Sequence, residues 1–130
     1  MTILCLKTDQ PEAFLALYQD DKLLEQTSWQ AHRQLAETIH QKIEELLANQ
    51  AKTLNDLNGI VCYKGPGSFT GLRIGLSVGN ALAYGLDALV VSDTGDDWQQ
   101  KGINRLANGE NEVTAMPEYG GKINITQPRK

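Results

Sequence analysis

Residues 65–83 read GPGSFTGLRIGLSVGNALA, and this stretch decides the fold. Gly65, Pro66 and Gly67 predict a tight turn from a strand into a helix, and Ser68 is placed to cap that helix. Backbone amides at such a helix start make a natural anion site. No Gly-Lys-Ser/Thr follows the glycines, so the turn is not a P-loop. A turn that simply needs glycine explains the same residues.

Small residues recur every four positions along the predicted helix, at Gly71, Gly75, Gly79 and Ala83. Each glycine inside a helix costs about 1 kcal/mol relative to alanine, so three on one line indicate that another element approaches the helix closely. The neighbouring rows are apolar too, which predicts burial on more than one face. We interpret one face as covering the parent sheet and the glycine ridge as facing a partner. The alternative is that the ridge packs entirely on its own sheet and the preceding helix.

Strand and helix patterns alternate on both sides of this stretch. The helix before it has an apolar stripe that includes Leu35, Ile39 and Ile43. The expected order is a three-stranded meander, a helix, a strand, a helix and a strand, over residues 3–8, 13–18, 22–29, 31–50, 60–63, 69–84 and 88–91. This order predicts an α/β fold in which helices cover a mixed sheet, as in an actin-like or ribonuclease H-like lobe.

The regular pattern ends at residue 92. Residues 93–111 are polar and rich in Gly, Asp and Asn, with Trp98, Ile103 and Leu106 as isolated apolar points. We therefore expect one lobe over residues 1–92 and an irregular, poorly structured tail over residues 93–130.

Composition narrows the class of protein. The chain has 130 residues, which is enough for one domain, and its net charge is −4. An acidic balance argues against direct contact with nucleic acid, which needs clustered Lys and Arg. No run approaches the roughly 20 apolar residues of a membrane helix, and the first apolar run is too short for a signal peptide, so we expect a cytoplasmic protein.

The two cysteines, Cys5 and Cys62, fall inside apolar runs that predict buried strands. We expect both to be reduced core thiols, as is usual in a cytoplasmic protein. A disulfide between adjacent strands is the alternative.

The run GPGSFTGLRIG, after a strand that contains Ile60 and Val61, resembles the signature of the TsaB (YeaZ) family. Similar segments of that family stand at residues 3–8, 31–35 and 54–60, so the likeness covers roughly residues 2–92. It implies the amino-terminal lobe of an actin-like protein that ordinarily has two lobes. It also implies a non-catalytic scaffold for tRNA N6-threonylcarbamoyladenosine modification. Its partners would be the TsaD-type catalytic subunit, which transfers the threonylcarbamoyl group, and a TsaE-type ATPase.

Lys7 departs from the family pattern, because the first strand there ordinarily ends in an Asp that helps to hold metal and phosphate in catalytic actin-like relatives. Mg²⁺ takes oxygen ligands, so we expect no metal, no cofactor and no catalytic residue in this chain. His32 and His40 are eight residues apart and lack the His-x-x-x-His spacing of TsaD-type relatives. The second lobe is also missing, and we expect a compact version, with truncation as the alternative.

The resemblance implies pairing, with TsaD or with a second copy, through the two helices of the lobe. Arg73 is expected to reach a carboxylate or carbonyl across that interface, and an ordinary surface arginine is the alternative. The predicted interface residues are Leu35, Ile39, Ile43, Phe69, Gly71, Leu72, Arg73, Gly75, Leu76, Gly79 and Ala83. Two rival functions stay open: a minimal nucleotide-binding phosphotransfer lobe of the actin-like class, and a homodimeric interaction protein of another role.

Overall fold

The computed structural model describes residues 1–67 and 69–117, without the side chains of His32 and Phe69. The expected Ser68 cap and residues 118–130 of the expected tail lie outside the described residues. The elements in chain order are β1 (Thr2–Lys7), β2 (Glu12–Gln19), β3 (Lys22–Gln30), α1 (Leu35–Asn49), β4 (Gly59–Tyr63), α2 (Phe69–Leu86), β5 (Leu89–Asp93) and α3 (Trp98–Ala107), with 3-10 turns at His32–Gln34 and Leu54–Asp56.

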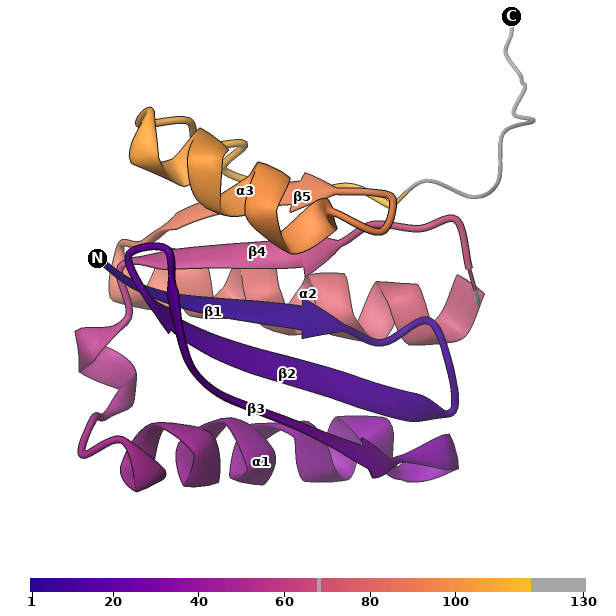
Figure 1. The fold of residues 1–130 in the computed structure, drawn as a ribbon. Helices are drawn as coiled ribbons and strands as arrows, with labels where there is room; N and C mark the ends of the chain where they lie inside the picture. The colour runs from indigo at the N-terminus through magenta and orange to yellow at the C-terminus, as the bar shows by residue number, and fades with distance from the viewer. Residues whose placement is uncertain (68, 118–130) are drawn as a thin grey trace, which may run out of the picture.

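Within the described residues, the strands form a five-stranded sheet in the order β3-β2-β1-β4-β5 (Figure 1). The first three strands pair antiparallel as a meander, whereas β1–β4 and β4–β5 pair parallel. Parallel strands need a long crossover, and α1 and α2 supply these two connections. The predicted α/β fold with a mixed sheet is therefore confirmed.

Side chains of β1 alternate between two hydrophobic cores, as strand geometry requires. Leu4 and Leu6 point toward α1 and α2, whereas Ile3 and Cys5 point toward α3. Figure 1 shows α3, in orange, on one side of the sheet and α2 on the other. Cys62 lies in the core of α1 and α2, opposite to Cys5, and both cysteines are buried and free. The two thiols lie on opposite faces of the sheet, so the alternative of a disulfide between them does not fit this fold.

Helix α3 corrects the expectation that residues 93–130 are irregular. Trp98, Ile103 and Leu106 share the buried face of this helix and are at most 4% exposed. The Trp98 ring makes edge contacts with Phe14 and Tyr63, at centroid distances of 6.3 and 5.8 Å. A ten-residue helix with few apolar residues gives a weak sequence signal, because its stability comes from packing on the sheet.

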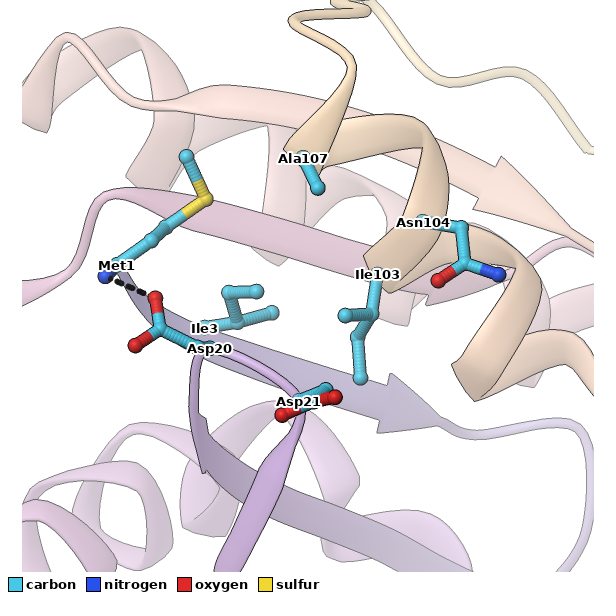
Figure 2. Close-up of a pocket in the computed structure, with 7 residues that line it drawn as sticks. All are labelled: Met1, Ile3, Asp20, Asp21, Ile103, Asn104 and Ala107. Carbon is cyan, nitrogen blue, oxygen red and sulfur yellow. Dashed lines mark hydrogen bonds and ion pairs between the residues drawn. The ribbon is translucent and has the colours of Figure 1, made fainter.

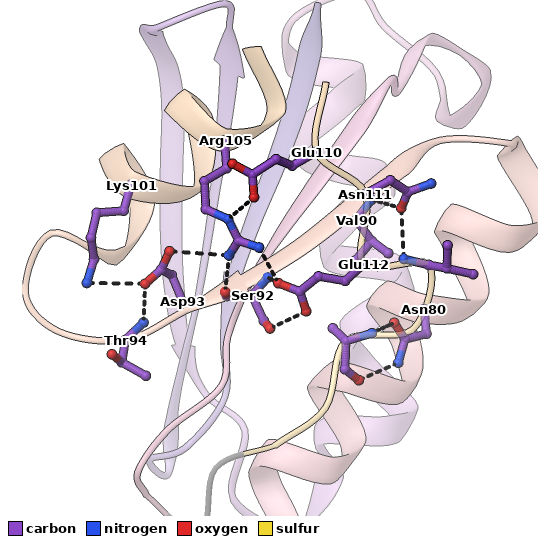
Figure 3. A network of polar contacts seen from close by, with 12 residues as sticks. Asn80, Val90, Ser92, Asp93, Thr94, Lys101, Arg105, Glu110, Asn111 and Glu112 are labelled. Atoms are coloured by element: carbon purple, nitrogen blue, oxygen red, sulfur yellow. Dashed lines mark hydrogen bonds and ion pairs between the residues drawn. The ribbon is translucent and has the colours of Figure 1, made fainter. Parts of the chain in front are cut away.

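The segment after α3 covers the outer edge of β5 (Figure 3). Glu112 donates its backbone N–H to the carbonyl oxygen of Val90 at 2.7 Å, and the Asn111 side chain accepts from the Val90 N–H at 3.1 Å. Further along, Asn80 of α2 exchanges two hydrogen bonds with the backbone of Ala115, at 3.0 and 2.8 Å. The bonds to Val90 occupy backbone groups of an edge strand that would otherwise be open to pairing with another chain.

Candidate functional site

Most of the predicted interface residues are core residues. Among those whose side chains are described, six are at most 5% exposed, namely Leu35, Ile39, Ile43, Leu72, Leu76 and Ala83. The apolar stripe of α1 faces the sheet, as expected for an amphipathic helix that covers one face. These side chains are buried inside the lobe, so their assignment to a partner-contacting surface is wrong. The side chain of Phe69 lies outside the described residues.

The glycine ridge of α2 also faces the sheet. A β-carbon on Gly71 would overlap the carbonyl oxygen of Thr8, and one on Gly75 would overlap the Thr8 hydroxyl. A β-carbon on Gly79 would meet the sulfur of Cys62. The interpretation that this ridge faces a partner is therefore wrong. The ridge lets the backbone of α2 lie close to β1 and β4, which is the alternative that the sequence left open.

The outward face of α2 carries a different set of residues. Arg73, Ser77, Ala81 and Tyr84 follow one another at three- and four-residue steps, and all are exposed. Tyr84 is 92% exposed. Gly85, four residues after Ala81, would meet no neighbouring atom if it carried a β-carbon. Ser77, Ala81 and Gly85 thus form a second row of small residues, on the side of α2 that points away from the sheet.

A shallow groove runs between α1 and α2 on the same outward side. Its apolar floor is half-buried Ile74 and buried Val78. The groove is lined by Ala36, His40, Ile74, Ser77, Val78 and Ala81. We call this groove, together with Arg73 and Tyr84, the outer helix surface. Small side chains at its rim allow a further helix to approach closely.

A second hollow lies on the other flank of α2, against the segment that ends the described chain. Its lining includes Arg73, Ser77 and Asn80 from α2, and Met116 from the segment. Three of the large apolar side chains that are exposed in the described residues belong to this flank or segment, namely Tyr84 (92%), Val113 (70%) and Met116 (64%). The three most exposed of the large apolar side chains in the described residues therefore belong to α2 or to the segment beside it, whereas Met1 and Leu23 lie elsewhere.

The carboxyl ends of the parallel strands are where an α/β sheet usually places its chemistry. At the end of β1, the Lys7 ammonium lies 2.6 Å from an oxygen of buried Asp9 and 4.6 Å from the centre of the Tyr63 ring. Within residues 1–67 and 69–117, no three His, Cys, Asp or Glu side chains gather in a way that would hold a metal ion.

A pocket on the opposite side of the sheet, beside α3, was not expected from the sequence (Figure 2). The N-terminal amine of Met1 and the carboxylate of Asp20 form an ion pair of 2.8 Å at its rim. Ile3 and Ile103 supply apolar walls. The full lining is Met1, Ile3, Asp20, Asp21, Ile103, Asn104 and Ala107. The polar groups of the pocket are two carboxylates, an amide and the N-terminal amine, and the amine is engaged in the ion pair with Asp20.

Comparison with known proteins gives a family match. The model described as TsaD: tRNA N6-adenosine threonylcarbamoyltransferase matches residues 28–92, from β3 to β5. Two relatives, from Haemophilus influenzae and Escherichia coli, are named tRNA threonylcarbamoyladenosine biosynthesis protein TsaB. They are 30% and 26% identical over 98% and 82% of this chain, and over 53% and 48% of their own lengths. The chain thus spans about half the length of these relatives.

Solved structures give the same fold. YeaZ from Pseudomonas aeruginosa has a TM-score of 0.67 at 25% identity, over 78% of this chain and 50% of its own. RuvC from T. thermophilus, solved with a Holliday junction substrate, has a TM-score of 0.52 at 12% identity over 92% of this chain and 84% of its own, and this likeness concerns the fold only. No helix in the described part of the chain is long and apolar enough to cross a bilayer.

Proposed function

This chain belongs to the family of the tRNA N6-adenosine threonylcarbamoyltransferase model and is a TsaB/YeaZ-like protein, and from that premise we propose that it serves tRNA threonylcarbamoyladenosine synthesis as a non-catalytic partner subunit. It binds a TsaD-type catalytic subunit through the outer helix surface. The observation that carries this proposal is that α1 and α2 bury their large apolar residues against the sheet, yet leave an apolar groove and Tyr84 open on the outward side.

The groove suits a helical partner. Apart from exposed His40, its rim is built from alanine and serine, so the backbone of an approaching helix can come within a short interaxial distance along α2. Tyr84 at one end presents a large aromatic side chain, the kind of residue that concentrates binding energy in protein interfaces. Helix α1 has exposed Glu37 and Glu44, and Arg73 adds a positive charge to the outer helix surface, so a partner with charged residues of both signs around its contact helix is favoured.

The end of β1 distinguishes a partner subunit from a nucleotide-binding enzyme lobe. At the end of β1 this chain has an ammonium group, which cannot ligate Mg²⁺. We therefore expect no binding of Mg-ATP by the chain in calorimetric titration. A dissociation constant in the low micromolar range would favour the enzyme alternative instead.

Co-purification with the TsaD-type subunit of the same organism tests the proposal. Ala81→Arg places a long charged side chain in the groove, where overpacking of a close contact costs about 3 kcal/mol. This corresponds to roughly a hundredfold weaker association, with the melting temperature unchanged because Ala81 is exposed.

Ala107→Arg is the matched control, since Ala107 is also an exposed helical alanine but lies on α3, on the other side of the sheet. The control is expected to bind as the parent chain does. Ala81→Arg that binds TsaD with parental affinity would contradict the proposed surface. Loss of self-association with TsaD binding intact would assign the groove to a homodimer.

A further inference from the structure

We infer that Lys7 and Asp9 form an internal ion pair that takes the place of a metal ion and a phosphate at the junction of β1 with α2. The pair closes this site and fixes the turn that starts α2. The inference concerns the strand ends and does not depend on the proposed partner surface.

The ion pair itself is the first observation. The Lys7 ammonium lies 2.6 Å from Asp9 Oδ1, and the Asp9 side chain is 4% exposed. A carboxylate withdrawn from water to this degree is costly unless a charge and hydrogen bonds compensate it. Lys7 supplies the charge, and the Gln10 side chain donates to the second oxygen at 3.3 Å. Because Lys7 is 31% exposed, the pair has one buried member and one that reaches solvent.

Tyr63, the last residue of β4, holds the cation from a second direction. Its ring centre lies 4.6 Å from the Lys7 ammonium, within the range of a cation–π contact. Its hydroxyl donates to the carbonyl oxygen of Pro66 at 3.1 Å. One side chain thus ties the ammonium at the end of β1 to the turn before α2.

The carboxylate packs against the same turn. A β-carbon on Gly67 would lie 2.6 Å from Asp9 Oδ2, so only glycine leaves room for this carboxylate. The preceding residue, Thr8, donates its hydroxyl to the carbonyl oxygen of Gly71, in the first turn of α2, at 2.8 Å. An anion near the start of a helix is stabilised by the partial positive charge of that end. Asp9 therefore supplies, from within the chain, the negative charge that this turn favours.

Metal and nucleotide phosphate are what the actin-like resemblance implies at this junction, and the residues present do not fit them. A metal ion there needs oxygen ligands that are free to coordinate. The terminal residue of β1 offers an ammonium, and the nearby carboxylate is engaged by that ammonium and packed on Gly67. The Lys7 ammonium supplies a positive charge and the Asp9 carboxylate a negative charge at this junction, and both belong to the chain itself.

A double-mutant cycle tests the pair. Lys7→Met leaves the buried Asp9 carboxylate without its partner, Asp9→Asn removes the charge that the partly exposed Lys7 ammonium faces, and the double variant removes both charges. We expect the two changes to be coupled at least tenfold in the unfolding equilibrium constant, or about 1.4 kcal/mol. The control is the pair Lys42 and Glu45, which are 3.9 Å apart and whose carboxylate is 51% exposed. We expect Lys42→Met and Glu45→Gln to be coupled less than about twofold, because neither charge is buried.

A coupling between Lys7 and Asp9 that is no larger than the coupling of the control pair would overturn the inference. Lys7→Met that folds only together with Asp9→Asn is the strongest form of the expected result. A double variant less stable than either single variant would overturn it.

Magnesium tests the claim that the ammonium takes the place of a metal. Lys7→Asp puts two carboxylates at the end of β1, so millimolar MgCl₂ is expected to raise its melting temperature by a few degrees and to leave that of the parent chain unchanged. A parent chain that Mg²⁺ stabilises equally, or a Lys7→Asp chain that Mg²⁺ does not affect, would overturn the claim.

Discussion

The hydroxyl group of Thr8 occupies the space that a β-carbon on Gly75 would need. This contact joins the residue after β1 to the middle of α2 and sets how closely the helix lies on the sheet. Gly75→Leu therefore forces β1 and α2 apart, and overpacking of this kind costs about 1–3 kcal/mol or more. We expect a lower melting temperature or an insoluble product.

Ser77→Leu is the comparison for Gly75→Leu, two residues along the same helix on its outward face. Ser77 is exposed, so this chain is expected to melt within a few degrees of the parent. Gly75→Leu that stays folded while losing only a partner would restore the interpretation that the glycine ridge is an interface.

Arg105 joins α3 to the segment that covers β5 (Figure 3). Its guanidinium contacts Glu110 at 2.8 Å, the carbonyl oxygen of Ser92 at 2.7 Å and Glu112 at 2.9 Å. Arg105→Met removes these three bonds and a longer contact of 3.4 Å with Asp93, and we expect urea denaturation to show a loss of about 1–3 kcal/mol. Because the edge of β5 then opens more often, the variant should also self-associate more at high concentration.

Exposed Arg33 provides the control for Arg105. Arg33→Met removes the same charge at a distance from β5 and is expected to leave both stability and oligomeric state unchanged. Equal losses of stability in the two variants would mean that the net charge of the chain, and not the contacts of Arg105, accounts for the effect.

Asp93 makes the stability of the fold depend on acid pH. Burial raises the pKa of its carboxyl group, but the Thr94 amide, Lys101 and Arg105 outweigh burial and lower that pKa overall. A lowered folded-state pKa means that this carboxylate stabilises the fold above its unfolded pKa of about 3.9, and that the contribution is lost as pH falls through the folded value. The stability difference between the parent chain and Asp93→Asn should therefore be largest near neutral pH and shrink below about pH 4.

Urea titrations of both chains between neutral and acid pH measure this difference. Asp96→Asn, at an exposed position in the same loop, serves as the control. A difference that stays constant with pH would contradict the assignment to the Asp93 ionisation.

The cysteines should be unreactive in the folded chain. Burial raises the pKa of Cys62 to about 12 and raises that of Cys5 as well, so the nucleophilic thiolate is scarce at pH 8. A disulfide reagent such as dithionitrobenzoate is expected to label neither thiol in buffer and both in guanidinium chloride. Rapid labelling of one thiol in buffer would show that a core face opens readily.

Much of the architecture follows from local patterns. The order of strands and helices through β5 is predicted correctly by three local features: the short apolar runs of β1 and β2, the apolar stripe of Leu35, Ile39 and Ile43, and the turn at Gly65–Gly67. The spacing of apolar residues within one segment indicates which face of that segment is buried, and neighbouring residues are enough to show it. This is why the elements, and the mixed sheet that their order implies, could be predicted.

The candidate site was harder to predict because α2 has two rows of small residues. One row contains Gly71 and Gly75, the other Ser77 and Ala81, and each is compatible with a close helix contact. Only the position of α2 over Thr8 decides that the glycines face the sheet. Among the predicted interface residues with described side chains, Arg73 is the one on the outward face.

By itself, then, the sequence determined the strand and helix order, the family resemblance, and the charge reversal at Lys7, because each is carried by neighbouring residues or by a contiguous motif. Tertiary structure decided three things: that α3 forms around Trp98, which side of α2 is free, and that Lys7 meets Asp9 and Tyr63 at one point. Each of these depends on contacts between segments far apart in the chain. The packing of a sheet between two helical layers fixes such contacts, and the periodicity of a single segment does not indicate them.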